Sequence, residues 1–378
     1  MNYIQKSAGS QVYNPALDGL RALAVLGVLV SHFGLGKFLD PLSQAAPWGH
    51  MGVRLFFVLS GYLITSILID CRERVNSKTE KARRTLYIFY MRRFLRILPL
   101  YYLTIVIMYL FGDSAFKEVW HMHAAFLSNT SGAVYAGAKG TGNLIDPNSA
   151  HFWSLSVEEQ FYLCWPFLII LLEKRTLILT TAGLILLAPL FRAGLFVAGY
   201  AQDVGYLPTC TDALGIGAII AFQRNGWLPA LSDRKKTILS IGAGIVSVTL
   251  LLLRAEGIFY RPFLIIFPAC EAILFGLLIN HLVCCESSKI GSVLSKPIPV
   301  FIGKISFGIY LLHAICADFT VKYIFNYQTS LLQFVVSTMV TVVVCSFVYF
   351  IFERPINSLK KHFSYSITAS RKEIVAPA

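Results

Sequence analysis

Arg21 and His32 are the residues of this chain whose types and spacing point most directly to chemistry. Both fall in one apolar stretch, LDGLRALAVLGVLVSHFGLG, and they are eleven residues apart. In an α-helix this spacing returns to nearly the same face and separates the two positions by about 16 Å along the axis. Ionisable groups inside a membrane helix are rare and are usually functional. The pair could therefore hold a long ligand, with an anionic end at Arg21 and a reactive end at His32.

A second group of candidates is cationic. The segment YMRRFLRILPLYY places Arg92, Arg93 and Arg96 at the predicted cytoplasmic end of a span. Arg93 and Arg96 share one helix face, and planar guanidinium groups bind phosphate oxygens in a bidentate way. The alternative is that these arginines only fix the topology and anchor the chain to lipid headgroups. The sequence leaves both interpretations open.

Two segments carry carboxylates at the outer edges of predicted spans. In HFWSLSVEEQFYLCWP, Glu158 could orient an imidazole, or it could favour the positive end of a helix, with Trp153 as an interface aromatic. In PTCTDALGIGAIIA, Asp212 has the same two interpretations, and the charge at a helix N-terminus is slightly favoured.

The segment GVRLFFVLSGYLIT places Arg54 near the outer end of a span, where it needs a carboxylate or a ligand as partner. Ser60 and Gly61 are small and favour close helix packing, and Tyr62 follows them. In ISFGIYLLH, an interhelical hydrogen bond is the favoured role of His313, with catalysis as the alternative.

These residues need membrane helices to position them. The chain has 378 residues, of which 56% are hydrophobic and 14% charged, so the composition predicts an all-α polytopic membrane protein. We expect about ten spans. Their approximate bounds are 17–36, 52–69, 97–111, 154–172, 177–198, 213–222 (extended upstream), 238–253, 263–282, 300–317 and 332–352.

The distribution of Lys and Arg predicts that both termini are cytoplasmic. This topology, with contact to anionic lipid, accounts for the net charge of +13 and excludes nucleic acid as a partner. Asp18, Arg21 and His32 argue against a cleaved signal peptide. The eight cysteines show no CxxC spacing, and the isolated His121 and His123 do not predict a metal site.

The order of these motifs resembles the family 3 membrane acyltransferases. The resemblance rests on LDGLRALAVLGVLVSHF, GVRLFFVLSGYLIT, RRFLRILPLYY, WSLSVEEQFYLCWP, ISFGIYLLH and FERP, and it covers about residues 17–355. It implies a bacterial enzyme of the inner membrane that transfers an acyl group to an exported or envelope carbohydrate, such as O-antigen or exopolysaccharide. The resemblance implies acetyl-CoA as the donor on the cytoplasmic side, with no metal, and a carbohydrate acceptor on the outer side.

Carried onto this sequence, the resemblance implies that His32 is catalytic, that Arg21 is its partner, and that Arg93 and Arg96 serve the acyl donor. Our reading of the residues adds Glu158 to the catalytic set and both Arg92 and Arg21 to the donor set. The supporting candidates are Asp18, Arg54, Tyr62, Trp153, Asp212 and His313.

The predicted organisation is a cytoplasmic segment 1–16, one transmembrane acyltransferase domain 17–356 and a basic cytoplasmic tail 357–378. No fused hydrolase-like domain is expected, so any periplasmic helper would be a separate protein. The competing function is a glycoconjugate transporter or flippase that uses Arg21, Arg54 and Glu158 as substrate or proton sites. Such a transporter would favour inverted repeats, which we do not detect. A third interpretation, an envelope scaffold, leaves the intramembrane charges unexplained.

Overall fold

The computed structural model is mostly helical in the residues that it describes, namely 13–35, 44–112, 114–130, 148–198, 205–258, 260–285, 288–325 and 330–365. The long helices are α1 (Pro15–His32), α3 (Trp48–Asn76), α4 (Ala82–Phe111), α5 (Ser114–Ala124), α7 (Phe152–Leu171), α8 (Lys174–Val197), α9 (Leu207–Arg224), α10 (Asp233–Ala255), α11 (Tyr260–Cys284), α13 (Pro297–Tyr323) and α14 (Leu331–Val348). The short elements are α12 (Lys289–Leu294), a π-helical turn (Tyr349–Glu353), α15 (Arg354–Ser358) and a 3-10 turn (Leu359–His362).

Within those ranges, eight helical segments are long and apolar enough to cross a membrane. The polytopic all-α class is therefore confirmed, but the prediction of about ten apolar spans is not. The difference lies in α7 and α9, which occupy the fourth and sixth predicted spans. Glu158, Glu159 and Asp212 lower the mean hydropathy of these two helices, and both helices bury many residues inside the bundle.

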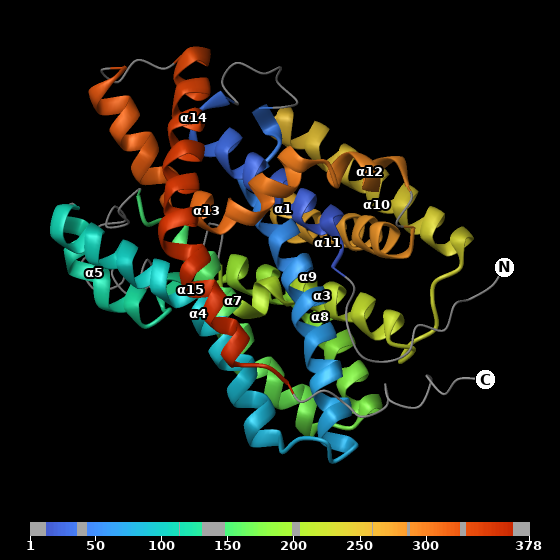
Figure 1. Cartoon of the computed structure of the whole chain (residues 1–378). Coiled ribbons are helices and arrows are strands. Elements are labelled where there is room, and N and C mark those ends of the chain that lie inside the picture. The colour runs from blue at the N-terminus through green and yellow to red at the C-terminus, as the bar shows by residue number, and fades with distance from the viewer. Residues whose placement is uncertain are drawn as a thin grey trace.

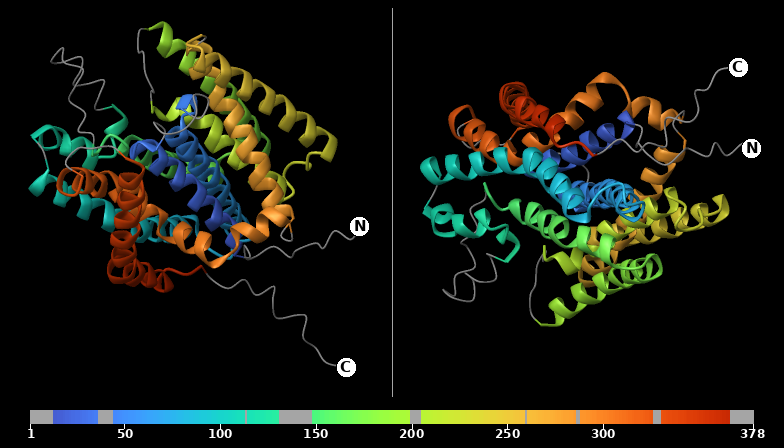
Figure 2. Two further views of the ribbon diagram at one scale, coloured as in Figure 1. Left: turned by 90° about the horizontal axis from the view of Figure 1, so that it is seen from above. Right: turned by 60° about the horizontal axis from the view of Figure 1, so that its bottom comes forward.

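The helix α3 forms the middle of the bundle. It packs against α1, α7, α9 and α11, and α1 in turn packs against α13. Figure 2 shows α1 and α3, in blue, between the yellow α10 on one side and the red α14 on the other. Figure 1 shows the arrangement of these helices. The site elements α1, α3, α7 and α13 bury many of their residues, whereas α8, α10 and α14 bury only a few each.

Glycines allow the closest of these contacts. A Cβ at Gly61 of α3 would lie 2.0 Å from the carbonyl oxygen of Leu214 in α9, and one at Gly52 would lie 2.3 Å from the Ala24 carbonyl in α1. Any side chain there would push the helix axes apart. The packing role predicted for Gly61 is confirmed, whereas Ser60 turns toward the interior cavity described below.

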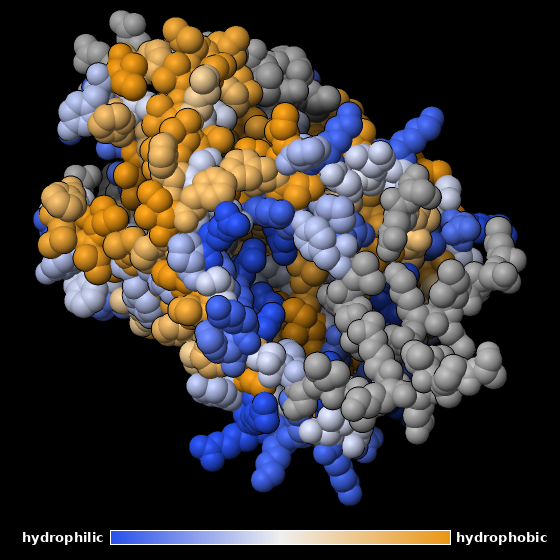
Figure 3. Space-filling model, in the orientation of Figure 1, coloured by the Kyte–Doolittle hydropathy of each residue, from blue (hydrophilic) through white to orange (hydrophobic). Residues whose placement is uncertain are grey.

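Large apolar side chains cover the peripheral helices. Leu186 of α8, Ile245 of α10 and Phe347 of α14 are 70%, 61% and 63% exposed. Figure 3 shows such hydrophobic surface over much of one face of the molecule. In water this surface would be costly, so these faces are suited to contact lipid.

The helix α4 begins much earlier than predicted. Its first residue is Ala82, whereas the predicted span began at Ile97. Arg93 and Arg96 therefore lie inside a continuous 30-residue helix. That they lie at the cytoplasmic mouth of a span stays a prediction. They point into the bundle from the middle of α4.

The segment after α4 forms the helix α5, and residues 131–147 lie outside the described ranges. His123 of α5 is buried beside Ser128, with 2.7 Å between Nδ1 and Oγ, and burial lowers the pKa of His123 to about 4. No group of potential metal ligands occurs in the described part of the chain. All eight cysteines are free.

Candidate active site

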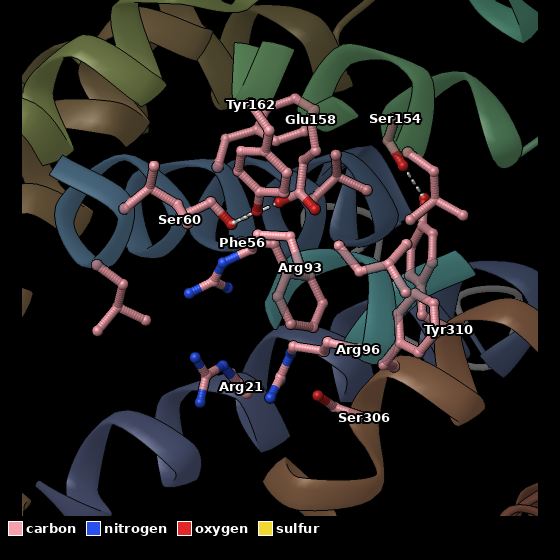
Figure 4. A pocket seen from close by; sticks show the side chains of 17 residues that line it. Arg21, Phe56, Ser60, Arg93, Arg96, Ser154, Glu158, Tyr162, Ser306 and Tyr310 are labelled. Carbon is pink, nitrogen blue, oxygen red and sulfur yellow. Dashed lines mark hydrogen bonds between the residues drawn. The ribbon is translucent and has the colours of Figure 1, made fainter. Parts of the chain in front are cut away.

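A polar cavity lies between α1, α3, α4, α7 and α13. Arg21, Arg93 and Arg96 approach it from one side, and Glu158 and Tyr162 from the other (Figure 4). Figure 3 shows a hydrophilic recess within the apolar face, close to α1 and α13. The other polar side chains that line the cavity are Ser60, Ser154, Ser306 and Tyr310.

Hydrogen bonds fix the carboxylate side of the cavity. Ser60 donates from Oγ to Glu158 Oε1 over 2.6 Å, and Tyr162 donates to Ser60 Oγ over 3.2 Å. Glu158 forms no hydrogen bond with His32 in the described part of the chain. The suggestion that Glu158 orients the imidazole is therefore not supported by this geometry.

The cation side is largely unpaired. Arg21 contacts the buried Asp18, which also accepts a hydrogen bond of 2.6 Å from the Tyr13 hydroxyl. Arg93 and Arg96 form no ion pair with any described carboxylate, and Nε of Arg93 is buried without a hydrogen-bond partner. Unpaired cations inside an apolar bundle are costly unless an anionic ligand meets them.

Arg92 is engaged elsewhere. Its Nη1 donates to the carbonyl oxygens of Lys360 and Phe363 over 3.2 and 2.9 Å. Arg92 thus binds the segment that follows α15 and is absent from the cavity lining. This arrangement assigns it a positioning role, in contrast to the direct donor contact expected from the sequence.

Three histidines meet at the end of α1. The ring centroid of His313 lies 4.7 Å from that of His32 and 4.6 Å from that of His151. His151 and His313 are buried, whereas His32 is exposed. Tyr310 joins this cluster to the cavity, because its hydroxyl group donates to the His151 carbonyl over 3.0 Å and also contacts Ser154 Oγ.

The backbone determines which nitrogen of His32 can act as a base. Nδ1 lies 2.9 Å from the carbonyl oxygen of Val28, which can only accept. In the neutral ring Nδ1 therefore carries the proton, and Nε2 carries the free lone pair. His313 is held in the same way, with Nδ1 2.7 Å from the Tyr310 carbonyl. That bond lies within one helix, and Nε2 of His313 has no hydrogen-bond partner among the described residues, so the predicted interhelical hydrogen bond is not found there.

Arg54 and Asp212 form a separate ion network. Asp212 Oδ1 lies 2.7 Å from Arg54 Nη2, and its Oδ2 lies 2.8 Å from Arg192 Nη1. Arg54 Nη2 also donates to the Pro268 carbonyl over 2.7 Å. Of the two partners expected for Arg54, a carboxylate or a ligand, the structure shows the carboxylate. Neither Arg54 nor Asp212 lines the cavity.

Two further predicted residues also lie outside the cavity lining. Tyr62 is buried in α3, and Trp153 packs edge-on against Phe57 with ring centroids 6.1 Å apart. Trp153 also lies under Gly205, where a Cβ would come within 2.1 Å of the indole ring. Both aromatic residues act as packing residues around the site.

Four residues of the site have roles that the sequence did not predict, namely His151, Ser60, Ser154 and Tyr310. Tyr310 precedes His313 by three residues, so the two share a face of α13, and that spacing could have drawn attention to it. His151 stands only seven residues before Glu158, but nothing in its local sequence indicates contact with α1 or α13. Its proximity to His32 results from the packing of helices far apart in the chain.

Comparisons with known proteins identify the family of this chain. The family model described as an acyltransferase domain matches residues 14–350. The chain belongs to the family 3 acyltransferases. The match includes the whole cavity and the three-histidine cluster. No solved structure matches the chain.

Several curated proteins are similar to this family member. Peptidoglycan O-acetyltransferase OatA of Listeria monocytogenes is 31% identical over 375 residues, covering 92% of this chain and 56% of the relative. O-acetyltransferase OatA of Staphylococcus aureus (strain NCTC 8325 / PS 47) is 30% identical over 376 residues, covering 93% of this chain and 58% of the relative. The chain thus spans a little over half the length of these relatives.

Proposed function

We propose that this protein is a membrane O-acyltransferase that moves an acetyl group from acetyl-CoA across the bacterial inner membrane to a carbohydrate hydroxyl. The observation that carries the proposal is the cavity with unpaired Arg93 and Arg96 at one end and its link through Tyr310 to the three-histidine cluster. Family membership and the named O-acetyltransferase relatives support acetyl as the group transferred.

The donor fits the cation side of the cavity. Coenzyme A carries phosphates at one end and a thioester at the other, which matches separate cationic and histidine ends. Arg93 and Arg96 would bind phosphate oxygens through their guanidinium groups, with Arg21 held in place by Asp18. The pantetheine arm would lie between the helices, so that the thioester approaches His32.

His32 would act as the general base. Its Nε2 takes the proton of the acceptor hydroxyl, whose oxygen bonds to the acyl carbonyl carbon as the carbon–sulfur bond breaks and the thiolate takes up a proton. A relay through an acyl-imidazole at Nε2 uses the same geometry. The exposure of His32 supports access for a bulky acceptor, while the buried His151 and His313 support its ring.

The acceptor belongs to the carbohydrates of the cell envelope. O-antigen and exopolysaccharide follow from the family resemblance, and the printed name of the Listeria relative adds peptidoglycan. Of these we favour peptidoglycan, because the OatA relatives align over nearly the whole of this chain. The transporter alternative predicts movement of an unmodified glycan and assigns no role to the free Nε2 of His32.

The test is acetyl transfer from radiolabelled acetyl-CoA in membranes that contain the wild type, His32→Ala or His281→Ala. His281 is an exposed histidine near the end of α11 and serves as the matched control. We expect label in the envelope carbohydrate for the wild type and the control, and background label for His32→Ala at equal membrane content. Equal labelling by wild type and His32→Ala would reject the proposal.

A further inference from the structure

Lys360 lies near the arginines of α4 although it is far from them in sequence and is not one of the residues that line the cavity. It belongs to the 3-10 turn Leu359–His362, and its side chain is partly buried. The ammonium group is within electrostatic range of Arg92, Arg93 and Arg96 and of one carboxylate, Glu353. Its hydrogen-bond partner is the neutral Asn357.

Four contacts hold the segment that carries Lys360. Arg92 donates to the carbonyl oxygens of Lys360 and Phe363, as described above. The Phe363 ring lies 6.0 Å from that of Tyr87, and the Arg74 guanidinium lies 5.5 Å from the centre of the Tyr365 ring. Residues 359–365 therefore form a strap that joins the end of α3 to the first half of α4.

The strap brings together charges that repel one another. Among the described residues, Arg93, Arg96 and Lys360 have no carboxylate within ion-pair distance, and Glu353 Oε1 is buried without a hydrogen-bond partner. Holding a third cation beside two arginines costs energy in the free protein. Binding of a multiply charged anion would recover that energy, because phosphate oxygens can accept from all three groups.

We propose that Lys360 is a further binding residue for the phosphate groups of the acyl donor, and that Arg92 positions it through the strap. This inference rests on the proposed function for the identity of the donor. It adds the C-terminal segment to a site otherwise built from α1, α3, α4, α7 and α13. The three cations would discriminate donors that carry the nucleotide phosphates from simpler thioesters.

The test compares Lys360→Gln with Lys361→Gln, a neighbouring exposed lysine, in the full chain. We expect Lys360→Gln to raise the KM for acetyl-CoA about tenfold with little change in kcat, and Lys361→Gln to leave both unchanged. S-acetyl-pantetheine lacks the phosphates, so with this donor Lys360→Gln should match the wild type. Lys360→Arg should restore most of the acetyl-CoA affinity.

Binding of coenzyme A to the purified proteins separates this inference from the proposed function. Lys360-dependent binding without any acetyl transfer by the wild type would reject the function and keep the phosphate site. Normal transfer with equal KM for the two glutamine variants would reject the role of Lys360 and keep the function. Equal loss with acetyl-CoA and S-acetyl-pantetheine would show that Lys360 only stabilises the fold.

Discussion

The protein holds two groups of arginines inside the helix bundle, and they are built in opposite ways. In the first, Asp212 pairs with both Arg54 and Arg192, at 2.7 and 2.8 Å. In the second, Arg93 and Arg96 line a cavity and pair with no described carboxylate. In the first group a carboxylate neutralises part of the arginine charge. In the second group the arginines have no counter-ion among the described residues.

This difference distinguishes a structural site from a binding site. A buried ion pair fixes the packing of the helices that contribute to it, here α3, α8, α9 and the neighbouring α11. An unpaired cation in a polar cavity destabilises the free protein and becomes favourable when an anion binds. The comparison therefore predicts that mutations in the first group affect stability and mutations in the second affect donor binding.

The largest effect is expected for Asp212→Asn. This change leaves Arg54 and Arg192 buried without a counter-ion and should lower the free energy of unfolding by about 3–5 kcal/mol. Thermal or denaturant unfolding in detergent measures it. Asp233→Asn is the control, because the Asp233 side chain is 99% exposed. Equal stability of the two variants would remove the structural interpretation of this network.

The second effect concerns Arg96→Gln. Removing one of the unpaired guanidinium groups relieves repulsion, so the stability should stay within about 1 kcal/mol of the wild type. The KM for acetyl-CoA should rise by about a hundredfold, because a charged hydrogen-bond donor to phosphate is lost. A large loss of stability with unchanged KM would reverse the assignments of the two arginine groups.

A smaller effect is expected for Arg54→Lys. Both contacts of Arg54 with Asp212 and Pro268 leave from the same nitrogen, Nη2, so an ammonium group can replace them in part. The shorter lysine side chain should cost about 1–2 kcal/mol of stability with no change in donor KM. Unfolding measurements and steady-state kinetics on the same preparation check both parts, and an altered KM would connect this network to the donor site.

The smallest effect is expected for Tyr310→Phe, which tests the link between the cavity and the histidines. The change removes the hydroxyl that donates to the His151 carbonyl and contacts Ser154. We expect a loss of about 1 kcal/mol in stability and a few-fold decrease in kcat. The KM for acetyl-CoA should not change. A kcat equal to that of the wild type would show that this link does not serve catalysis.

Much of the site could be predicted because it lies within local motifs. Arg21 and His32 belong to one helix, so their spacing alone indicated a shared face, and the structure places Arg21 at the cavity and His32 beside His151 and His313. The spacing of Arg93 and Arg96 likewise indicated that they share one helix face. The start of α4 was missed because its first half is rich in Arg, and hydropathy detects the apolar part of a membrane helix only.

The sequence by itself determined the all-helical membrane class, the succession of motifs and the intrahelical pair Arg21 and His32. These properties follow from composition and helix periodicity, which are local. The tertiary structure decided that Arg54 pairs with Asp212, that His151 and His313 flank His32, and that Arg92 binds the strap. Each of these contacts joins helices that are distant in the chain, so it depends on how helix faces pack, which no local pattern specifies.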